Sequence, residues 1–148
     1  MKCPPKLFVR NLQRTVRLNL LDLQTFGDEA LRLCLKLRTT KRSELAKLSE
    51  VSVLLISNRR MSALHKKFLH QSGPTDVLTF EHGEIFVSAE TARENALRFG
   101  SSLADELRLY VVHGLLHLHG FDDRTKVDAR KMELIQRRIA AKASERID

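Results

Sequence analysis

The chain has 148 residues, of which 43% are hydrophobic and 30% are charged, so we expect a soluble globular protein with one domain over 1–148. Its formal net charge of +8 favours an acidic partner such as nucleic acid, although a basic surface that only aids solubility would have the same charge. No segment approaches the ~20 apolar residues of a membrane-spanning helix. Cys3 and Cys34 are too few for a disulfide scaffold, and no secretory signal is recognisable. We therefore expect a cytoplasmic protein without a membrane partner.

The first half of the chain alternates predicted strands and helices. Residues 6–10 favour a strand, and apolar residues at helical spacing predict an amphipathic helix over 20–37. The β-branched, apolar run 51–56 is typical of a buried strand. We expect Asn58 to cap a helix over 59–70, because an asparagine side chain can accept a hydrogen bond from a free N–H of the first turn.

The next segment predicts a β-hairpin followed by a helix. Short apolar runs at 77–80 and 84–87 flank a His-Gly pair that suits a tight turn. Ser88 is a partial N-cap signal for a helix that reaches Phe99. Gly100 is expected to end this helix, because glycine accepts the left-handed conformation found at many helix ends.

Two further helices complete the predicted domain. Ser102, supported by Asp105, is expected to cap the first, and Thr125 to cap the second. The second helix is predicted to carry one apolar stripe, made of Val127, Met132, Ile135 and Ile139. The pattern fits an α+β or an α/β fold. We favour α+β, with a small mixed β-sheet packed by about five helices in a single zinc-hydrolase-like domain.

The first of these two helices carries two histidines four residues apart. His113 and His117 fall on the same helix face, so both imidazoles can bind one zinc ion. Gly120 is expected to end the helix, after which the chain can return Asp122 or Asp123 toward the histidines. Three protein ligands would leave one zinc position open, as in catalytic sites. The alternative is a core-facing helix with one buried and one surface histidine.

Two residues near the histidine pair, Gly114 and His119, limit which reactions and ligands the site can have. Zinc proteases of the His-Glu-x-x-His type carry a glutamate after the first histidine as general base, whereas this chain has Gly114 there. Gly114 and the positive net charge both disfavour a zinc hydrolase of non-nucleic substrates. His119 lies about 200° around the helix from His117, so we expect it to face elsewhere.

Three segments together are similar to the motifs of a known family. Residues 74–80 (PTDVLTF), 83–88 (GEIFVS) and 113–123 (HGLLHLHGFDD) resemble, in order and spacing, motifs of the YbeY family of bacterial metal-dependent endoribonucleases. The resemblance implies a single-strand-specific endoribonuclease that acts in ribosomal RNA maturation and ribosome quality control. RNA would be its partner, with the ribosome or its proteins as further partners. The resemblance also implies one Zn²⁺ ion per chain, held by His113, His117 and Asp123.

The chain departs from the family pattern at two positions. The family's third zinc ligand is a histidine where this chain has Asp123, and a carboxylate oxygen is also an acceptable zinc ligand. The family carries an arginine, thought to serve catalysis, where this chain has Leu69. No catalytic residue is therefore assigned. Four nearby cations are candidates for RNA binding in its place: Arg59, Arg60, Lys66 and Lys67. Both departures favour, as the alternative, a non-catalytic RNA- or ribosome-binding protein of the same fold.

The other acidic and histidine residues have simpler interpretations. Asp76 could orient a ligand histidine, but we expect it to close a turn with Thr75. Glu84 could act as a general base, but we expect it to face solvent. The remaining histidines have no ligand-like spacing and are expected on the surface: His65, His70 and His82.

Basic residues outnumber aromatic ones in every candidate RNA-binding segment. They gather in 10–17, 32–42, 59–67 and 124–142. Aromatic residues are few, with seven Phe, one Tyr and no Trp. We therefore expect contacts with phosphates to outweigh base stacking in any complex with RNA.

Overall fold

The computed structural model describes residues 3–39, 41–69 and 76–148 and has four strands and five α-helices within them. The strands are β1 (Lys6–Asn11), β2 (Glu50–Ile56), β3 (Val77–Phe80) and β4 (Glu84–Ser88). The helices are α1 (Leu20–Leu35), α2 (Asn58–Leu69), α3 (Ala89–Phe99), α4 (Leu103–Leu118) and α5 (Lys126–Ser144), with a short 3-10 helix η1 at Leu45–Lys47. The prediction of an α+β fold with a small mixed sheet and about five helices is confirmed.

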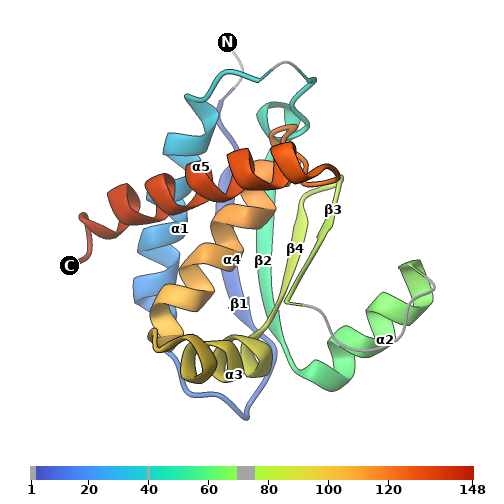
Figure 1. Ribbon diagram of the computed structural model, residues 1–148, viewed down its shortest axis with the longest axis vertical. Coiled ribbons are helices and arrows are strands. Elements are labelled where there is room, and N and C mark those ends of the chain that lie inside the picture. The colour runs from blue at the N-terminus through green and yellow to red at the C-terminus, as the bar shows by residue number, and fades with distance from the viewer. Residues whose placement is uncertain (1–2, 40, 70–75) are drawn as a thin grey trace.

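The sheet places β3 at one edge, next to the C-terminal half of α4. Its strand order is β1-β2-β4-β3, with β1, β2 and β4 parallel and β3 antiparallel to β4. The predicted β3–β4 hairpin is therefore present. Figure 1 shows α4 lying along one face of the sheet, with α1 beside it and α5 crossing over both. The main hydrophobic core fills the space between these helices and the sheet and includes Phe26, Val53 and Leu115.

Helix α4 packs closely on the sheet because Gly114, which faces Ile85 of β4, has no side chain. A Cβ atom at Gly114 would lie 2.5 Å from Cγ2 of Ile85 on β4, well inside van der Waals contact. A glutamate after His113, as in zinc proteases, is therefore incompatible with this packing. The same close approach brings His113 and His117 to the edge where β3 lies.

The opposite face of the sheet has a smaller core. Leu54, Leu78 and Phe86 pack there with Met61 of α2. Figure 1 shows α2 projecting from the body of the molecule on this side. Helix α2 therefore stands beside the β3–β4 hairpin, not over the helix that carries the histidine pair.

Three of the predicted helix caps are present. The hydroxyl oxygens of Ser88, Ser102 and Thr125 each accept a hydrogen bond from the backbone N–H three residues later. Gly100 ends α3 with a φ of 68°, in the left-handed region that favours glycine. These local signals give α3, α4 and α5 the starts that the sequence predicts.

The predicted cap of α2 is wrong. Asn58 is the first helical residue, and the Ser57 hydroxyl accepts the Arg60 N–H at 3.2 Å. The Asn58 side chain instead accepts hydrogen bonds from the hydroxyl groups of Ser88 and Thr91 at the start of α3. The local cap is therefore Ser57, one residue earlier, and Asn58 joins the starts of two helices instead.

Two predictions from apolar patterns include residues that the structure leaves out: the end of α1 and the apolar stripe of α5. Helix α1 ends at Leu35 and not at residue 37, because the Leu37 N–H bonds back to the Cys34 carbonyl at 3.0 Å in a tighter turn. In α5, Val127 is 77% exposed, whereas Met132 is buried. At 100° per residue the two lie about 140° apart around the helix, so Val127 does not belong to the buried stripe.

Candidate metal centre

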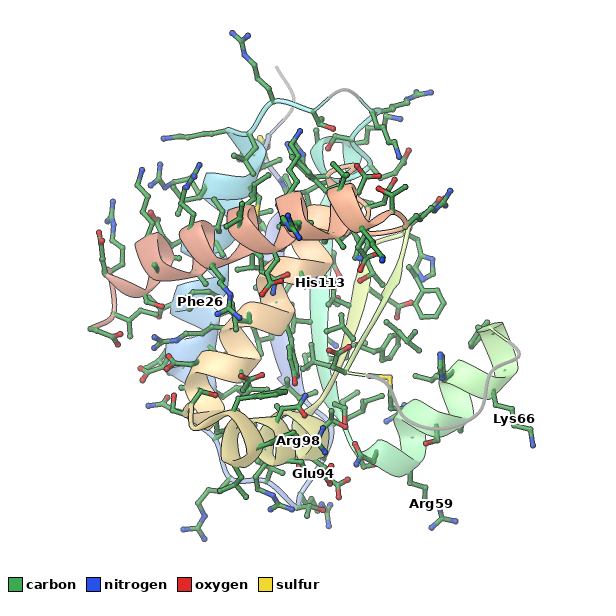
Figure 2. All side chains as sticks on the ribbon, viewed as in Figure 1. Phe26, Arg59, Lys66, Glu94, Arg98 and His113 are labelled. Carbon is green, nitrogen blue, oxygen red and sulfur yellow. The ribbon has the colours of Figure 1, made fainter. Side chains whose placement is uncertain are left out.

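Helix α4 and the turn after it bring three ligand-type side chains together. His113 and His117 are one turn apart, and their Nε2 atoms lie 3.0 Å from each other. Gly120 has a φ of 105°, which lets the chain reverse so that Asp123 returns. The Asp123 carboxylate oxygens lie 3.8 Å from each of the two Nε2 atoms. Figure 2 shows His113 on α4, close to where α5 crosses it.

Hydrogen bonds on the far side of each imidazole fix which nitrogen faces the centre. Nδ1 of His117 lies 3.1 Å from the carbonyl oxygen of Phe121. Since a carbonyl only accepts, Nδ1 must carry the hydrogen and Nε2 must carry the lone pair. Nδ1 of His113 lies 2.8 Å from Oε1 of Gln136 on α5, which sets the same tautomer. Such bonds from the outer nitrogen are typical of histidines that bind metals.

The resulting donor set fits a divalent cation. Two Nε2 lone pairs and a carboxylate converge, with their ligand atoms all within 4.8 Å of one another. Two lone pairs 3.0 Å apart repel unless a proton or a cation lies between them. Zinc bonds of ~2.0–2.1 Å to nitrogen in a tetrahedron place two nitrogens roughly 3.3 Å apart, close to the spacing found here.

His117 is held in its neutral form. Burial lowers the pKa of His117 below its usual 6.5, and the neighbouring His113 lowers it further, while Asp123 opposes both effects. Neutral imidazole is the form that binds metals. Near pH 7 this histidine therefore needs to lose no proton before it can act as a ligand.

Asp122, the other acid after the glycine turn, lines the same cleft but is not part of the group of ligand-type side chains. Its carboxylate forms an ion pair with Lys41 in the segment between α1 and η1. The hydrogen bond from Lys41 holds the pKa of Asp122 below its usual value. The open question of which aspartate lies beside the histidines is thus answered by geometry in favour of Asp123.

The remaining histidines lie away from this centre where the structure describes them. His119 is only 4% exposed, and its ring nitrogens contact the Leu37 carbonyl and the Ser43 hydroxyl at 2.8 and 2.7 Å. His119 thus holds the segment after α1 in place. It faces away from His117, as the sequence predicts. His82 is exposed and paired with Glu84, which is itself partly open to solvent.

The predictions for Asp76 and for two further histidines differ in outcome. Asp76 accepts the N–H of Val77 through its own side chain at 2.8 Å, and the turn predicted with Thr75 stays a prediction. His65 lies on α2 and is partly exposed. Thr75 and His70 lie outside the described residues.

A cleft of about 510 Å³ opens beside the histidine pair. Strand β3, the end of α4 and the segments around residues 41–44 and 120–124 form its walls. Arg42 and Arg124 line it, and neither forms an ion pair with any other residue in the described part of the chain. Thr79 also lines the cleft, and its hydroxyl oxygen is buried without a hydrogen-bond partner among the described residues.

The four cations that the sequence predicts for RNA binding are exposed on α2, and none of them lines the cleft. Figure 2 shows Arg59 and Lys66 pointing away from His113. The side chain of Leu69 lies outside what the structure describes. Sequence reasoning did not single out Lys41, Arg42, Arg124 or Gln136. Lys41, Arg42 and Arg124 lie in the basic segments 32–42 and 124–142, but the sequence did not indicate which residues of these segments reach the cleft.

Comparison with known proteins places the chain in a family. Residues 9–144 match the family model described as "Endoribonuclease YbeY". The chain belongs to this family. The endoribonuclease YbeY of Kineococcus radiotolerans is 34% identical over 109 residues, covering 62% of this chain and 63% of that protein. The chain thus spans less than two thirds of this relative. The endoribonuclease YbeY of Thermobifida fusca is 32% identical over 111 residues, covering 64% of this chain and 72% of that protein.

A solved structure has a similar fold. The solution structure of TM1509 from Thermotoga maritima is similar to this fold with a TM-score of 0.65 and 27% sequence identity. The similarity covers 94% of this chain and 91% of that chain. None of the helices in the described residues is long and apolar enough to cross a membrane.

Proposed function

We propose that this protein is a zinc-dependent endoribonuclease that cleaves single-stranded RNA in the cytoplasm, in the maturation and quality control of ribosomal RNA. One observation carries the proposal. Two histidines with fixed tautomers and one carboxylate converge in an open cleft, in a chain of the YbeY endoribonuclease family. One zinc ion per chain would be held by His113, His117 and Asp123.

The residues present fit zinc, although one differs from the pattern of the family. When bound, zinc would supply Lewis acidity toward a phosphoryl oxygen and would make water acidic near neutral pH. Asp123 adds a negative charge that a neutral histidine lacks, and this charge moderates the Lewis acidity. Gln136 and the Phe121 carbonyl hold the two imidazoles in place by hydrogen bonds to their outer nitrogens.

The side chains around the cleft suit a phosphate ester. Arg42 and Arg124 can balance the negative charge of the substrate and of its transition state. Lys41 is already paired with Asp122, so its role is to hold the turn that carries Asp123.

RNA, with the ribosome or its proteins as further partners, is the binding partner that the basic charge favours. The exposed cations of α2 would contact RNA outside the cleft: Arg59, Arg60, Lys66 and Lys67. A non-catalytic RNA- or ribosome-binding role is the second candidate, because Asp123 and Leu69 replace residues of the family pattern. A hydrolase of non-nucleic substrates is disfavoured by the packing of Gly114 on Ile85.

Cleavage assays on matched RNAs test the proposal. The purified protein should cut a single-stranded RNA and leave the same sequence intact when a complementary strand is annealed. Chelator treatment should abolish cleavage, and zinc should restore it. Binding of the single strand without cleavage, at every zinc concentration, would favour the non-catalytic role. No binding at low salt would remove RNA as the partner.

A further inference from the structure

Three of the seven phenylalanines gather beside the β3–β4 hairpin, on the side away from the cleft. The Phe80 ring lies 5.4 Å from the Phe68 ring of α2 and 5.7 Å from the Phe86 ring of β4, edge to face in both cases. The imidazole of His82 is stacked on Phe80, with 5.8 Å between ring centroids and 21° between planes. These four rings form one aromatic cluster: Phe68, Phe80, His82 and Phe86.

The outer rings of the aromatic cluster are exposed, and the inner ones support them. Phe86 is buried and Phe80 packs against the smaller core. Phe68 is 50% exposed, and the His82 side chain is 68% exposed. An isolated exposed phenylalanine needs no explanation. Two exposed aromatic rings fixed on two inner rings make a rigid surface on which flat apolar groups can stack.

Lysines of α2 lie beside Phe68 of the aromatic cluster, while Glu84 pairs with His82. The Lys67 ammonium lies 5.4 Å from the centroid of the Phe68 ring. Lys66 is exposed on the same helix, and Figure 2 shows it extending from α2 into solvent. Aromatic rings beside lysines suit a ligand that carries flat rings on a phosphate backbone, because the bases stack and the phosphates contact the cations.

Strand β3 joins the aromatic cluster to the metal cleft. Thr79 lines the cleft, whereas the next residue, Phe80, packs with the smaller core on the α2 side, as expected for side chains that alternate along a strand. Since β3 is at the edge of the sheet, an extended chain can pass over it from one side to the other.

We infer that the aromatic cluster stacks unpaired bases of the RNA strand whose phosphate backbone occupies the metal cleft. The inference rests on the proposed function and extends it. It gives the α2 cations a role at a distance from the histidines, since Lys66 and Lys67 contact phosphates that flank the stacked bases. It also explains selection for single strands, because a base paired in a duplex has no free face.

The test uses a short single-stranded RNA that carries one 2-aminopurine, a base whose fluorescence falls when it is stacked. Mixed with zinc-loaded protein and read within seconds, before cleavage, its fluorescence should fall. Phe68→Ala and His82→Ala should each weaken binding at least about fivefold and reduce the quenching. Phe99→Ala is the matched control, because Phe99 is an exposed phenylalanine on α3. It should leave both signals unchanged.

Two further measurements distinguish stacking of RNA bases on Phe68 and His82 from a packing role of these side chains in the fold. Inorganic polyphosphate has charge but no bases, so its affinity should not change in Phe68→Ala or His82→Ala. Phe68→Leu keeps an apolar contact with Phe80 but removes the flat ring, so RNA binding should stay weak. Equal losses for RNA and polyphosphate, or full rescue by leucine, would overturn the inference. His82 is so exposed that its variant can be judged even if Phe68 variants fold poorly.

The inference and the proposed function fail in different ways. Quenching that depends on Phe68 and His82, in a protein that never cleaves, would leave the stacking surface standing and remove the nuclease activity. Cleavage of the RNA with no quenching at any 2-aminopurine position would do the reverse.

Discussion

Oε1 of Gln136 lies 2.8 Å from Nδ1 of His113, so helix α5 orients a candidate metal ligand of helix α4. We expect Gln136→Leu to weaken zinc binding roughly 10- to 100-fold, because the ring loses the acceptor that fixes its tautomer. Gln136→Glu should retain or tighten binding, since a carboxylate accepts the same hydrogen bond. Competition with a zinc chelator measures both variants. Equal affinities for wild type and the leucine variant would show that Gln136 does not support the ligand.

The two neighbouring aspartates should behave differently. Asp123→His should increase zinc retention, because a third imidazole nitrogen suits zinc better than a carboxylate oxygen does. Asp123→Asn should weaken zinc retention. Asp122→Asn is the comparison variant and should cost less zinc, because Asp122 pairs with Lys41 and supplies no ligand atom. Zinc content after dialysis checks the order of the four proteins. A greater loss from Asp122→Asn than from Asp123→Asn would reverse the assignment.

Substitution of the two arginines of the cleft should weaken RNA binding and cleavage without changing the zinc content. Arg42→Ala and Arg124→Ala should each slow RNA cleavage on the order of 10-fold. They should each also reduce the slope of log affinity against log salt by about 0.7, the value for one phosphate contact on a single strand. Arg98→Ala, at an exposed position on α3, should change neither. Altered zinc content in the cleft variants would point to an indirect effect on the centre.

Acidification should act on the metal-free protein through His117. Its pKa is lowered in the folded chain, so between that value and 6.5 the unfolded chain binds more protons than the folded one. The free energy of unfolding therefore rises with pH through this window and gains nothing more from His117 above 6.5. NMR titration should find the His117 midpoint below 6.5. Chemical unfolding at several pH values should show a smaller pH dependence in His117→Gln. A midpoint above 6.5 would contradict the sign.

Short-range signals explain what the sequence predicted well. Ser102 caps α4 three residues ahead of the N–H that it accepts, and Gly120 takes the positive φ that its position after the helix suggested. The convergence of His113 and His117 follows from helix periodicity alone. The spacing could not decide between Asp122 and Asp123, because that choice depends on Lys41, which lies 81 residues before Asp122.

Long-range contacts explain what the sequence could not show. Gln136 contacts His113 from α5, and no local pattern in the sequence marks it. Arg42 lies in a basic segment, but the sequence does not show that it lines the cleft. Asn58 has the residue type of a cap, but a contact with Ser88 and Thr91 uses its side chain. The expectation that stacking would be minor came from counting aromatic residues, and a count does not reveal that the fold gathers Phe68, Phe80 and Phe86 in one place.

The most direct test of the account is the zinc content of gently purified protein beside that of the double variant His113→Ala/His117→Ala. Circular dichroism should first establish that both are folded. Elemental analysis should find about one zinc per chain in the wild type and none in the variant, and only the wild type should cleave single-stranded RNA. Equal zinc content in the two proteins, or cleavage that survives in the variant, would contradict the assignment of the centre.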